Sequence, residues 1–252
     1  MKREVKQLFA DCRATKAEVI QEEHLHGLPA PVQRHLRYAG IIGRERVGAV
    51  RLKQKGVIRM KQEGRWMPFT ARQYYTTDPP AFIWKAGVKL GPLTLITGRD
   101  KYYRGEGNML IKLFSLFKIA DASGPEMDQG TLLRYLNEAM WFPSVYLNDY
   151  VQWEPLDSGS ARATMSYQGV TASAVLYFGE EGELTNFVAE RYMAVGGQYR
   201  LETWSTPISE YGEMNGVRLP IRGSGVWNLS SGDFEYIRIA LHDIEYNCPS
   251  AY

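Results

Sequence analysis

The sequence predicts an α+β protein that is mainly antiparallel β: a large curved meander sheet forming an unclosed barrel, with N-terminal helices and a helical plug. From Val47 onward, β-branched and aromatic residues alternate with polar ones, and breaks of Gly, Pro, Asn and Asp separate the runs. Several breaks are hairpin-sized, such as Gln168-Gly169 and Gly196-Gly197, so successive strands should pair antiparallel. A sheet of so many strands twists and coils, so we expect a concave inner face.

The individual strands follow from this alternation. In the last run, Ile237, Ile239 and Leu241 share one face, as expected for a strand with one side in the core. The predicted strands are Val47–Met60, Trp66–Thr76, Ala81–Leu90, Leu93–Thr97, Lys101–Arg104, Val151–Glu154, Ala161–Tyr167, Val170–Phe178, Leu184–Val195, Gln198–Thr206, Val217–Leu229 and Phe234–Tyr246.

Helices are expected before the sheet and in an insert between its strands. Val5–Glu23 carries a broken apolar stripe, and Pro31–Ala39 follows two helix-starting prolines. In the insert, Met109–Phe117 reads as a short apolar helix or loop, and Gln129–Trp141 as a helix with Asp128 as its N-cap. We expect one domain over residues 1–252, with a helical segment at 1–44, the sheet at 45–104 and 149–247, and the helical insert at 105–148.

Bulk composition is that of a globular domain and argues against several classes of protein. With 44% hydrophobic and 23% charged residues, the chain is not expected to be disordered. Lys and Arg number 30 against 28 Asp and Glu, and the charges are interspersed, so no nucleic-acid partner is expected. Residues 1–23 contain no apolar run long enough for a signal peptide or a membrane span, which predicts a soluble cytoplasmic protein without an integral membrane segment.

Motifs for metals, cofactors and nucleophiles are missing from the sequence. Cys12 and Cys248 lie near opposite ends, and His24 and His26 are two residues apart, the wrong interval for one helix face. Gly105-Glu106-Gly107 lacks the remaining residues of a phosphate-binding loop and reads as a turn. We therefore expect no cofactor and no metal, and we assign no catalytic residue.

Two charged clusters are candidate site residues, each with two interpretations. On the predicted helix Gln129–Trp141, Arg134, Glu138 and Trp141 share one face, with Tyr135 at its edge. They are either a surface ion pair with a tryptophan shielding the rim of the sheet, or the wall of a pocket.

The second cluster lies on two strands expected to be neighbours. Glu190 and Arg191 belong to one, and Glu202 and Trp204 to the next. Such charges form either solvated cross-strand pairs or, on the concave face, groups that orient a ligand.

Abundant aromatic residues, 12% of the chain and including Trp84 and Tyr103, suggest how the concavity is lined. A wide half-barrel cannot fill its own mouth with strands, so helices, aromatics or a ligand must occupy it. An apolar cavity is therefore expected.

Several stretches resemble an uncharacterised bacterial family, a domain of unknown function, which implies no activity. They are Leu28-Pro-Ala-Pro-Val-Gln-Arg34, Gly64-Arg-Trp66, Pro68-Phe-Thr-Ala71, Pro80-Ala-Phe-Ile-Trp84, Gly130-Thr-Leu-Leu-Arg-Tyr-Leu136 and Glu138 with Trp141-Phe-Pro143. The last fifth, with Tyr211, Asn215-Gly-Val-Arg-Leu-Pro220 and Asp243-Ile-Glu-Tyr-Asn247, is similar to the ending of periplasmic lipoprotein carriers. That similarity implies an unclosed barrel with helices plugging a concavity that accepts acyl chains.

These observations favour a non-catalytic protein that binds a hydrophobic or lipid-like ligand in an apolar concavity. One alternative is an enzyme, for example hydrolase-like, in which Glu138, or Glu190 with Glu202, acts as acid or base beside an arginine. A second is a structural partner in an assembly; the sequence does not fix an oligomeric state. The candidate ligand-binding residues are Arg134, Tyr135, Glu138, Trp141, Trp84, Tyr103, Glu190, Arg191, Glu202 and Trp204.

Overall fold

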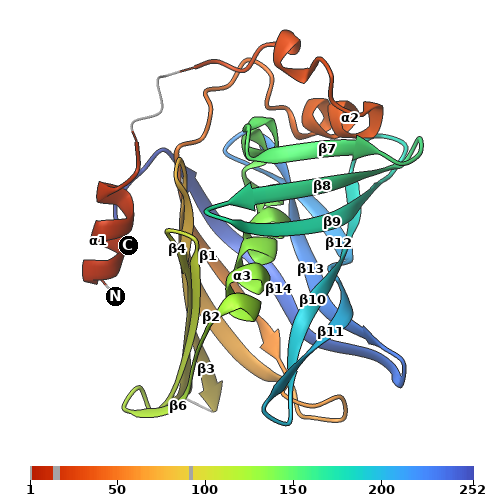
Figure 1. Ribbon diagram of the computed structural model, residues 1–252. Coiled ribbons are helices and arrows are strands. Elements are labelled where there is room, and N and C mark those ends of the chain that lie inside the picture. The colour runs from red at the N-terminus through yellow and green to blue at the C-terminus, as the bar shows by residue number, and fades with distance from the viewer. Residues whose placement is uncertain (1, 14–17, 91–92) are drawn as a thin grey trace.

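A computed structural model describes residues 2–13, 18–90 and 93–252, and its strands form one strongly curved antiparallel sheet (Figure 1). The strands are β1 (Ala49–Ile58), β2 (Met67–Thr77), β3 (Pro80–Leu90), β4 (Leu93–Tyr103), β5 (Glu106–Leu113), β6 (Phe117–Ser123), β7 (Val151–Pro155), β8 (Ser160–Tyr167), β9 (Val170–Phe178), β10 (Leu184–Val195), β11 (Gln198–Ser205), β12 (Ile208–Met214), β13 (Val217–Leu229) and β14 (Gly232–Tyr246). The helices are α1 (Lys2–Ala10), α2 (Ala30–Ala39) and α3 (Pro125–Glu138), with 3-10 turns η1 (Glu22–Leu25), η2 (Ala139–Trp141) and η3 (Pro143–Leu147). The half-barrel and the α+β class expected from the sequence are confirmed.

The order of strands explains why the sheet is open. It runs β6-β5-β4-β3-β2-β1-β14-β13-β11-β10-β9-β8-β7, with β12 paired to β13 beyond the end of β11. The first and last strands meet in the middle, where Val50 pairs with Tyr246, so each half of the sheet is a meander of hairpins. Strands β6 and β7 form the two edges, and the segment between them contains α3.

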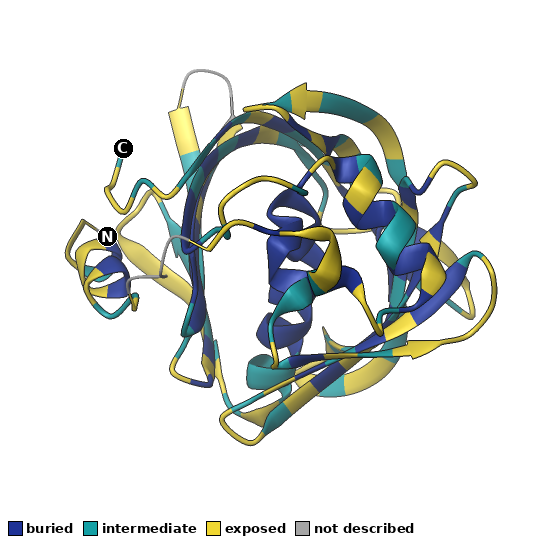
Figure 2. Cartoon of the chain, turned by 90° about the horizontal axis from the view of Figure 1, so that it is seen from above, coloured by how far each residue is buried: buried dark blue, intermediate teal, exposed yellow. Residues whose placement is uncertain are grey.

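Helix α3 lies inside the curve of the sheet (Figures 1 and 2). Its Leu132, Leu133, Tyr135 and Leu136 are completely buried, because the helix packs on β4 and β5 of one half and on β9 and β10 of the other. The main core therefore fills the space between the concave face and α3. A smaller core lies on the outer face, where Val5, Leu8 and Phe9 of α1 cover β2 and β3.

The largest correction to the sequence prediction concerns the insert. Met109–Phe117 is neither a helix nor a loop: its first five residues belong to β5, and a tight turn leads into β6 at Phe117. Phe114 and Ser115 make that turn with positive φ angles of 51° and 62°. The apolar run is part of a β-hairpin. Met109 and Ile111 line the cavity, and Leu110 pairs with Asp121 in the ladder between β5 and β6. The helical insert therefore begins at Pro125, not at residue 105.

The N-terminus of α3 also differs from the prediction. The helix starts at Pro125 after Gly124, so Asp128 is not its N-cap. The Asp128 carboxylate instead accepts a hydrogen bond from the Gly107 amide on β5, at 2.6 Å. This contact ties the first turn of α3 to the sheet.

Other element boundaries in the structure differ from the predicted ones for local reasons. The predicted strands Leu93–Thr97 and Lys101–Arg104 form one strand, β4, which ends at Tyr103, because Gly98 to Asp100 continue the ladder with β3. Strand β12 was not predicted from its polar sequence Ile-Ser-Glu-Tyr-Gly-Glu-Met. Within Val5–Glu23, the described helical residues belong to α1 and η1, and residues 14–17 lie outside the described part. Helix α2 is confirmed over Ala30–Ala39, ending at Gly40 with φ 74°.

None of the helices in the described residues has the length and apolar character needed to cross a lipid bilayer.

Candidate functional site

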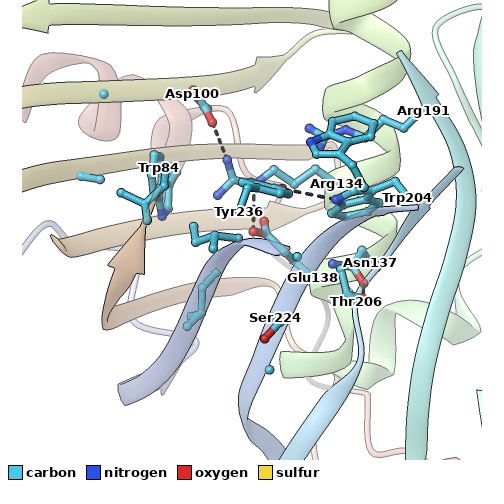
Figure 3. Close-up of a pocket in the computed structure, with 18 of the residues that line it drawn as sticks. Trp84, Asp100, Arg134, Asn137, Glu138, Arg191, Trp204, Thr206, Ser224 and Tyr236 are labelled. Atoms are coloured by element: carbon cyan, nitrogen blue, oxygen red, sulfur yellow. Dashed lines mark hydrogen bonds and ion pairs between the residues drawn. The ribbon is translucent and has the colours of Figure 1, made fainter. Parts of the chain in front are cut away.

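A cavity of about 500 Å³ lies between α3 and the concave face of the sheet (Figure 3). Its walls come from α3 and η2, from strands β1 to β5 and from strands β10 to β14. Met60 and Tyr192 belong to the wall although 61% and 38% of their surfaces are exposed, so the cavity opens to solvent beside them. Its lining therefore combines residues that lie far apart in the sequence.

The cavity wall concentrates the soft and aromatic residues of the chain. Six of the nine methionines and four of the six tryptophans line it. Methionine is flexible and polarizable and adapts to ligands of different shape, while tryptophan supplies a large apolar surface. These residues are Met60, Met67, Met109, Met127, Met140, Met193, Trp84, Trp141, Trp204 and Trp227.

A buried ion cluster centred on Arg134 forms one side of the cavity. The Arg134 Nε donates to Glu138 Oε1 at 2.8 Å, one helical turn away, and Nη1 donates to Asp100 Oδ2 of β4 at 2.5 Å. The guanidinium also lies 4.7 Å from the ring centre of Trp84. Burial disfavours the charged form of Arg134, but the charges of Glu138 and Asp100 prevail and raise the pKa of its guanidinium above its ordinary value.

The second oxygen of Glu138 is bound from the sheet. Oε2 accepts hydrogen bonds from Gln73 Nε2 at 2.7 Å and from the Tyr75 hydroxyl at 2.9 Å, both on β2. Burial and the negative charge of Glu138 raise the pKa of Tyr75 above its ordinary value, so this phenol stays protonated and donates. With three donors on its two oxygens, Glu138 locks the end of α3 to β2.

Arg191 of β10 lines another part of the cavity, where its guanidinium contacts aromatic rings. Its guanidinium carbon stands 4.6 Å from the ring centre of Trp204 and 5.8 Å from that of Trp227. Its Nε is buried without a hydrogen-bond partner in the described structure. Nearby on α3, Asn137 accepts a hydrogen bond from Thr206 at 2.8 Å, which adds polar groups to the wall (Figure 3).

The structure brings six of the ten candidate residues together. They line the cavity and are Trp84, Arg134, Glu138, Trp141, Arg191 and Trp204. Whether they bind a ligand remains a proposal, but the interpretation of Arg134 and Glu138 as a surface pair is wrong. Their side chains are only 13% and 5% exposed, because α3 is covered on both faces inside the barrel.

The other four candidates lie outside the cavity wall. Tyr103 packs beneath α1 on the outer face and donates to Asp11. Tyr135 is fully buried and donates to the Thr76 carbonyl at 2.9 Å. Glu190 is exposed and accepts from Thr203 at 2.7 Å. Glu202 pairs with Arg191 in the strand register but does not belong to the wall.

The sequence analysis missed several polar wall residues, among them Asp100, Asn137 and Thr206. Asp100 ends the segment Gly98-Arg99-Asp100, which the sequence predicted to be a break between two strands and which therefore gave no direction for its side chain. Asn137 is next to Glu138 on a helix whose two faces are both buried, where the usual separation of polar and apolar faces gives no signal. In the described residues no group of three or more His, Cys, Asp and Glu is arranged to hold a metal ion.

Comparison with known families places the chain. A model described as a family of unknown function, DUF6544, matches residues 18–239. The chain belongs to the DUF6544 family. This confirms the resemblance to an uncharacterised family read from the sequence. No curated protein matches the chain.

Solved structures with similar chain arrangements were also found. A DUF1329 family protein from Desulfovibrio piger has a TM-score of 0.49 and 10% identity, covering 89% of this chain and 95% of its own. A lipoprotein-sorting protein domain from Vibrio parahaemolyticus, described as putative, gives 0.45 and 8%, covering 80% and 86%. A LolA superfamily protein from Nitrosomonas europaea gives 0.48 and 9%, covering 88% and 94%.

Proposed function

We propose that this protein binds a hydrophobic, lipid-like molecule in the cavity beside α3 without converting it chemically. The observation that carries the proposal is the cavity itself. Protein interiors rarely leave voids larger than a water molecule, whereas this space of about 500 Å³ stays open although a whole helix already occupies the barrel. Its volume falls within the range of roughly 300–1,000 Å³ of small-molecule sites.

The chemistry of the wall supports binding over catalysis. A general acid or base needs a carboxylate that can reach a substrate proton. Glu138 already accepts three hydrogen bonds, and Asp100 shares the Arg134 guanidinium. Both carboxylates therefore stabilise the position of α3, and most of the surface left for a ligand is apolar, including the methionine and tryptophan side chains.

A cavity-filling substitution tests the proposal. Gly98 on β4 lines the cavity, and a Cβ built there meets a single atom within 4 Å, Trp84 Cζ3 at 3.6 Å. Gly98→Leu should therefore fold and fill the space. We expect it to weaken binding of the uncharged dye N-phenyl-1-naphthylamine at least tenfold, measured by fluorescence titration, because the dye loses its apolar contacts.

Thr97→Leu is the matched control, since neighbouring residues of a strand point to opposite faces and Thr97 is not part of the wall. It should bind the dye as the unmodified protein does. Equal dye affinity in Gly98→Leu and the unmodified protein would refute the proposal. Native mass spectrometry and lipid extraction of the purified protein then show which molecules it retains.

A further inference from the structure

Four arginines line the cavity, and their partners differ. Arg59 donates hydrogen bonds to the Glu235 and Gln62 carbonyls, and Arg222 forms an ion pair with Glu210. Arg134 is bound by two carboxylates, Asp100 and Glu138. Arg191 has no hydrogen bond and no ion pair with any described residue, and its Nε is buried. A cation held partly away from water without a counter-ion is costly, and this cost favours an anion as its partner.

No described residue accepts a hydrogen bond from the Arg191 guanidinium. Its guanidinium lies over the ring of Trp204, and the centre of the Trp227 ring is 5.8 Å from its guanidinium carbon. Stacking uses the flat faces of the guanidinium, whereas its N–H donors point outward in the plane. This planar fork matches the two oxygens of a carboxylate or phosphate.

Two neighbours define how Arg191 is placed. Gly130 of α3 has no side chain, and the atom nearest to a Cβ built there is Arg191 Nε at 3.7 Å, so the arginine lies directly against the helix. Glu202 is its register partner on β11 and shares its face of the sheet, yet no ion pair joins the two. Glu202 is therefore the carboxylate whose effect on Arg191 a test must distinguish from the effect of a bound anion.

We propose that the ligand is an anionic amphiphile whose carboxylate or phosphate is bound by Arg191 while its apolar chain occupies the methionine-lined cavity. This inference rests on the proposed function and names its ligand class. Arg191 would fix the orientation of the ligand, because it is the lining arginine whose guanidinium has no hydrogen bond with a described residue, and apolar residues line most of the remainder of the cavity. Fatty acids and lipids with a phosphate headgroup share the required chemistry.

The test compares three probes that share one alkyl chain: dodecanoate, dodecyl phosphate and uncharged dodecanol. Their affinities for the full chain are measured by displacement of N-phenyl-1-naphthylamine. We expect at least one anion to bind ten times or more tightly than dodecanol. Arg191→Met should weaken anion binding by about 10- to 100-fold, the effect of losing hydrogen bonds to a charged group, and leave dodecanol unchanged.

Retained dodecanol binding shows that the Arg191→Met protein is folded with its cavity intact. Arg200→Met removes an exposed positive charge from the neighbouring strand and should change none of the affinities. Glu202→Gln should leave anion binding unchanged or make it tighter. Stronger binding of dodecyl phosphate than of dodecanoate would assign a phosphate headgroup, and the reverse order would assign a fatty acid. Either result supports the proposal if the binding of that anion depends on Arg191.

Equal affinity of the unmodified protein for dodecanol and both anions would overturn the inference. So would an Arg191→Met protein that weakens all three probes alike, or a Glu202→Gln protein that loses anion binding as Arg191→Met does. These outcomes leave the proposed function standing, since dodecanol still binds. Failure of all three probes, together with dye binding that ignores Gly98→Leu, would instead refute the proposed function.

Discussion

Arg134 shows how a single residue supports the cavity without being free to act in it. Its guanidinium neutralises Glu138 from its own helix and Asp100 from β4, and only 13% of its side chain is exposed. Removing one partner of such a buried pair leaves an uncompensated charge, which costs more than the pair contributed. The arrangement predicts a loss of stability when Arg134 is replaced, with the two carboxylates as its cause.

Arg134→Met should lower the free energy of unfolding by about 3–5 kcal/mol, measured by urea denaturation at neutral pH. Adding Glu138→Gln to this variant should recover part of the loss, because the amide removes one of the two uncompensated charges. Arg162→Met is the control: its ion pair with Glu154 is exposed, so we expect a change of less than about 1 kcal/mol. A similar small effect from Arg134→Met would contradict this account of the cluster.

For individual residues, the sequence predicted contacts between side chains better than it predicted the environment of those side chains. The four-residue spacing of Arg134 and Glu138 predicted their contact, but the environment depends on α3 lying inside the barrel, which no local pattern reveals. Asp100, the third member, is 34 positions away from Arg134 and meets it only through the curvature of the sheet. Periodicity could place each residue on a face of its element but could not say which faces meet.

Among the elements, α3 and β5 approach each other closely at Gly107. A Cβ built on Gly107 would overlap Thr131 Oγ1 and the Met127 carbonyl oxygen, and would lie 2.8 Å from the Met127 carbonyl carbon. The same close approach allows the Gly107 amide to donate to Asp128. Glycine is required here because a helix backbone rests directly on a strand, not because of its backbone angles.

Gly107→Ala should therefore destabilise the protein by about 1–3 kcal/mol, the usual cost of inserting a methyl group into a filled contact. Gly98→Ala is the matched control on the neighbouring strand, where the added Cβ finds room, and it should change stability by less than the Gly107 variant. Thermal unfolding followed by circular dichroism compares the two. Equal midpoints would show that α3 can shift away from β5 without cost.

The elements also show where sequence patterns are ambiguous. Strands with strict alternation, such as β8 and β9, were predicted within a residue or two of their ends. Met109–Phe117 was wrongly predicted to be a helix or loop, because a short continuous apolar run fits a buried helix and a strand equally well. Strand β12 is polar because it lies beside β13 beyond the end of β11, and Ser209 and Glu210 are exposed there.

For the molecule as a whole, α3 joins the two halves of the sheet. The halves are paired through β1 and β14, and α3 packs between β4 and β5 on one side and β9 and β10 on the other. At one end of the barrel, α2 packs on β8, β9 and β13 (Figure 1). Because one main core connects these elements, we expect the sheet and its helices to unfold together, so a change at α2 should alter the stability of the whole chain.

His35 on α2 makes global stability depend on pH. Its Nδ1 lies 2.9 Å from the Gly182 carbonyl oxygen and its ring packs against Phe178, so it is buried in the neutral form. Burial lowers the pKa of His35 from 6.5 to about 4, with the hydrogen bond to Gly182 opposing the shift only in part. Between these two values the unfolded chain binds a proton that the folded chain does not, so stability from this residue is complete above pH 6.5 and is lost as the pH falls toward 4.

From pH 7 to pH 5, the unmodified protein should therefore lose about 2 kcal/mol more free energy of unfolding than His35→Phe, whose side chain does not titrate. Urea denaturation at both pH values measures this difference and cancels the contribution of the carboxylates, which are the same in both proteins. Fluorescence of the cavity tryptophans and circular dichroism of the sheet should give the same midpoints, because protonation at α2 acts on one cooperative structure. Parallel losses in the two proteins would show that His35 is accessible to protons in the folded state, and separate midpoints would show that α2 and its end of the barrel unfold independently of the cavity.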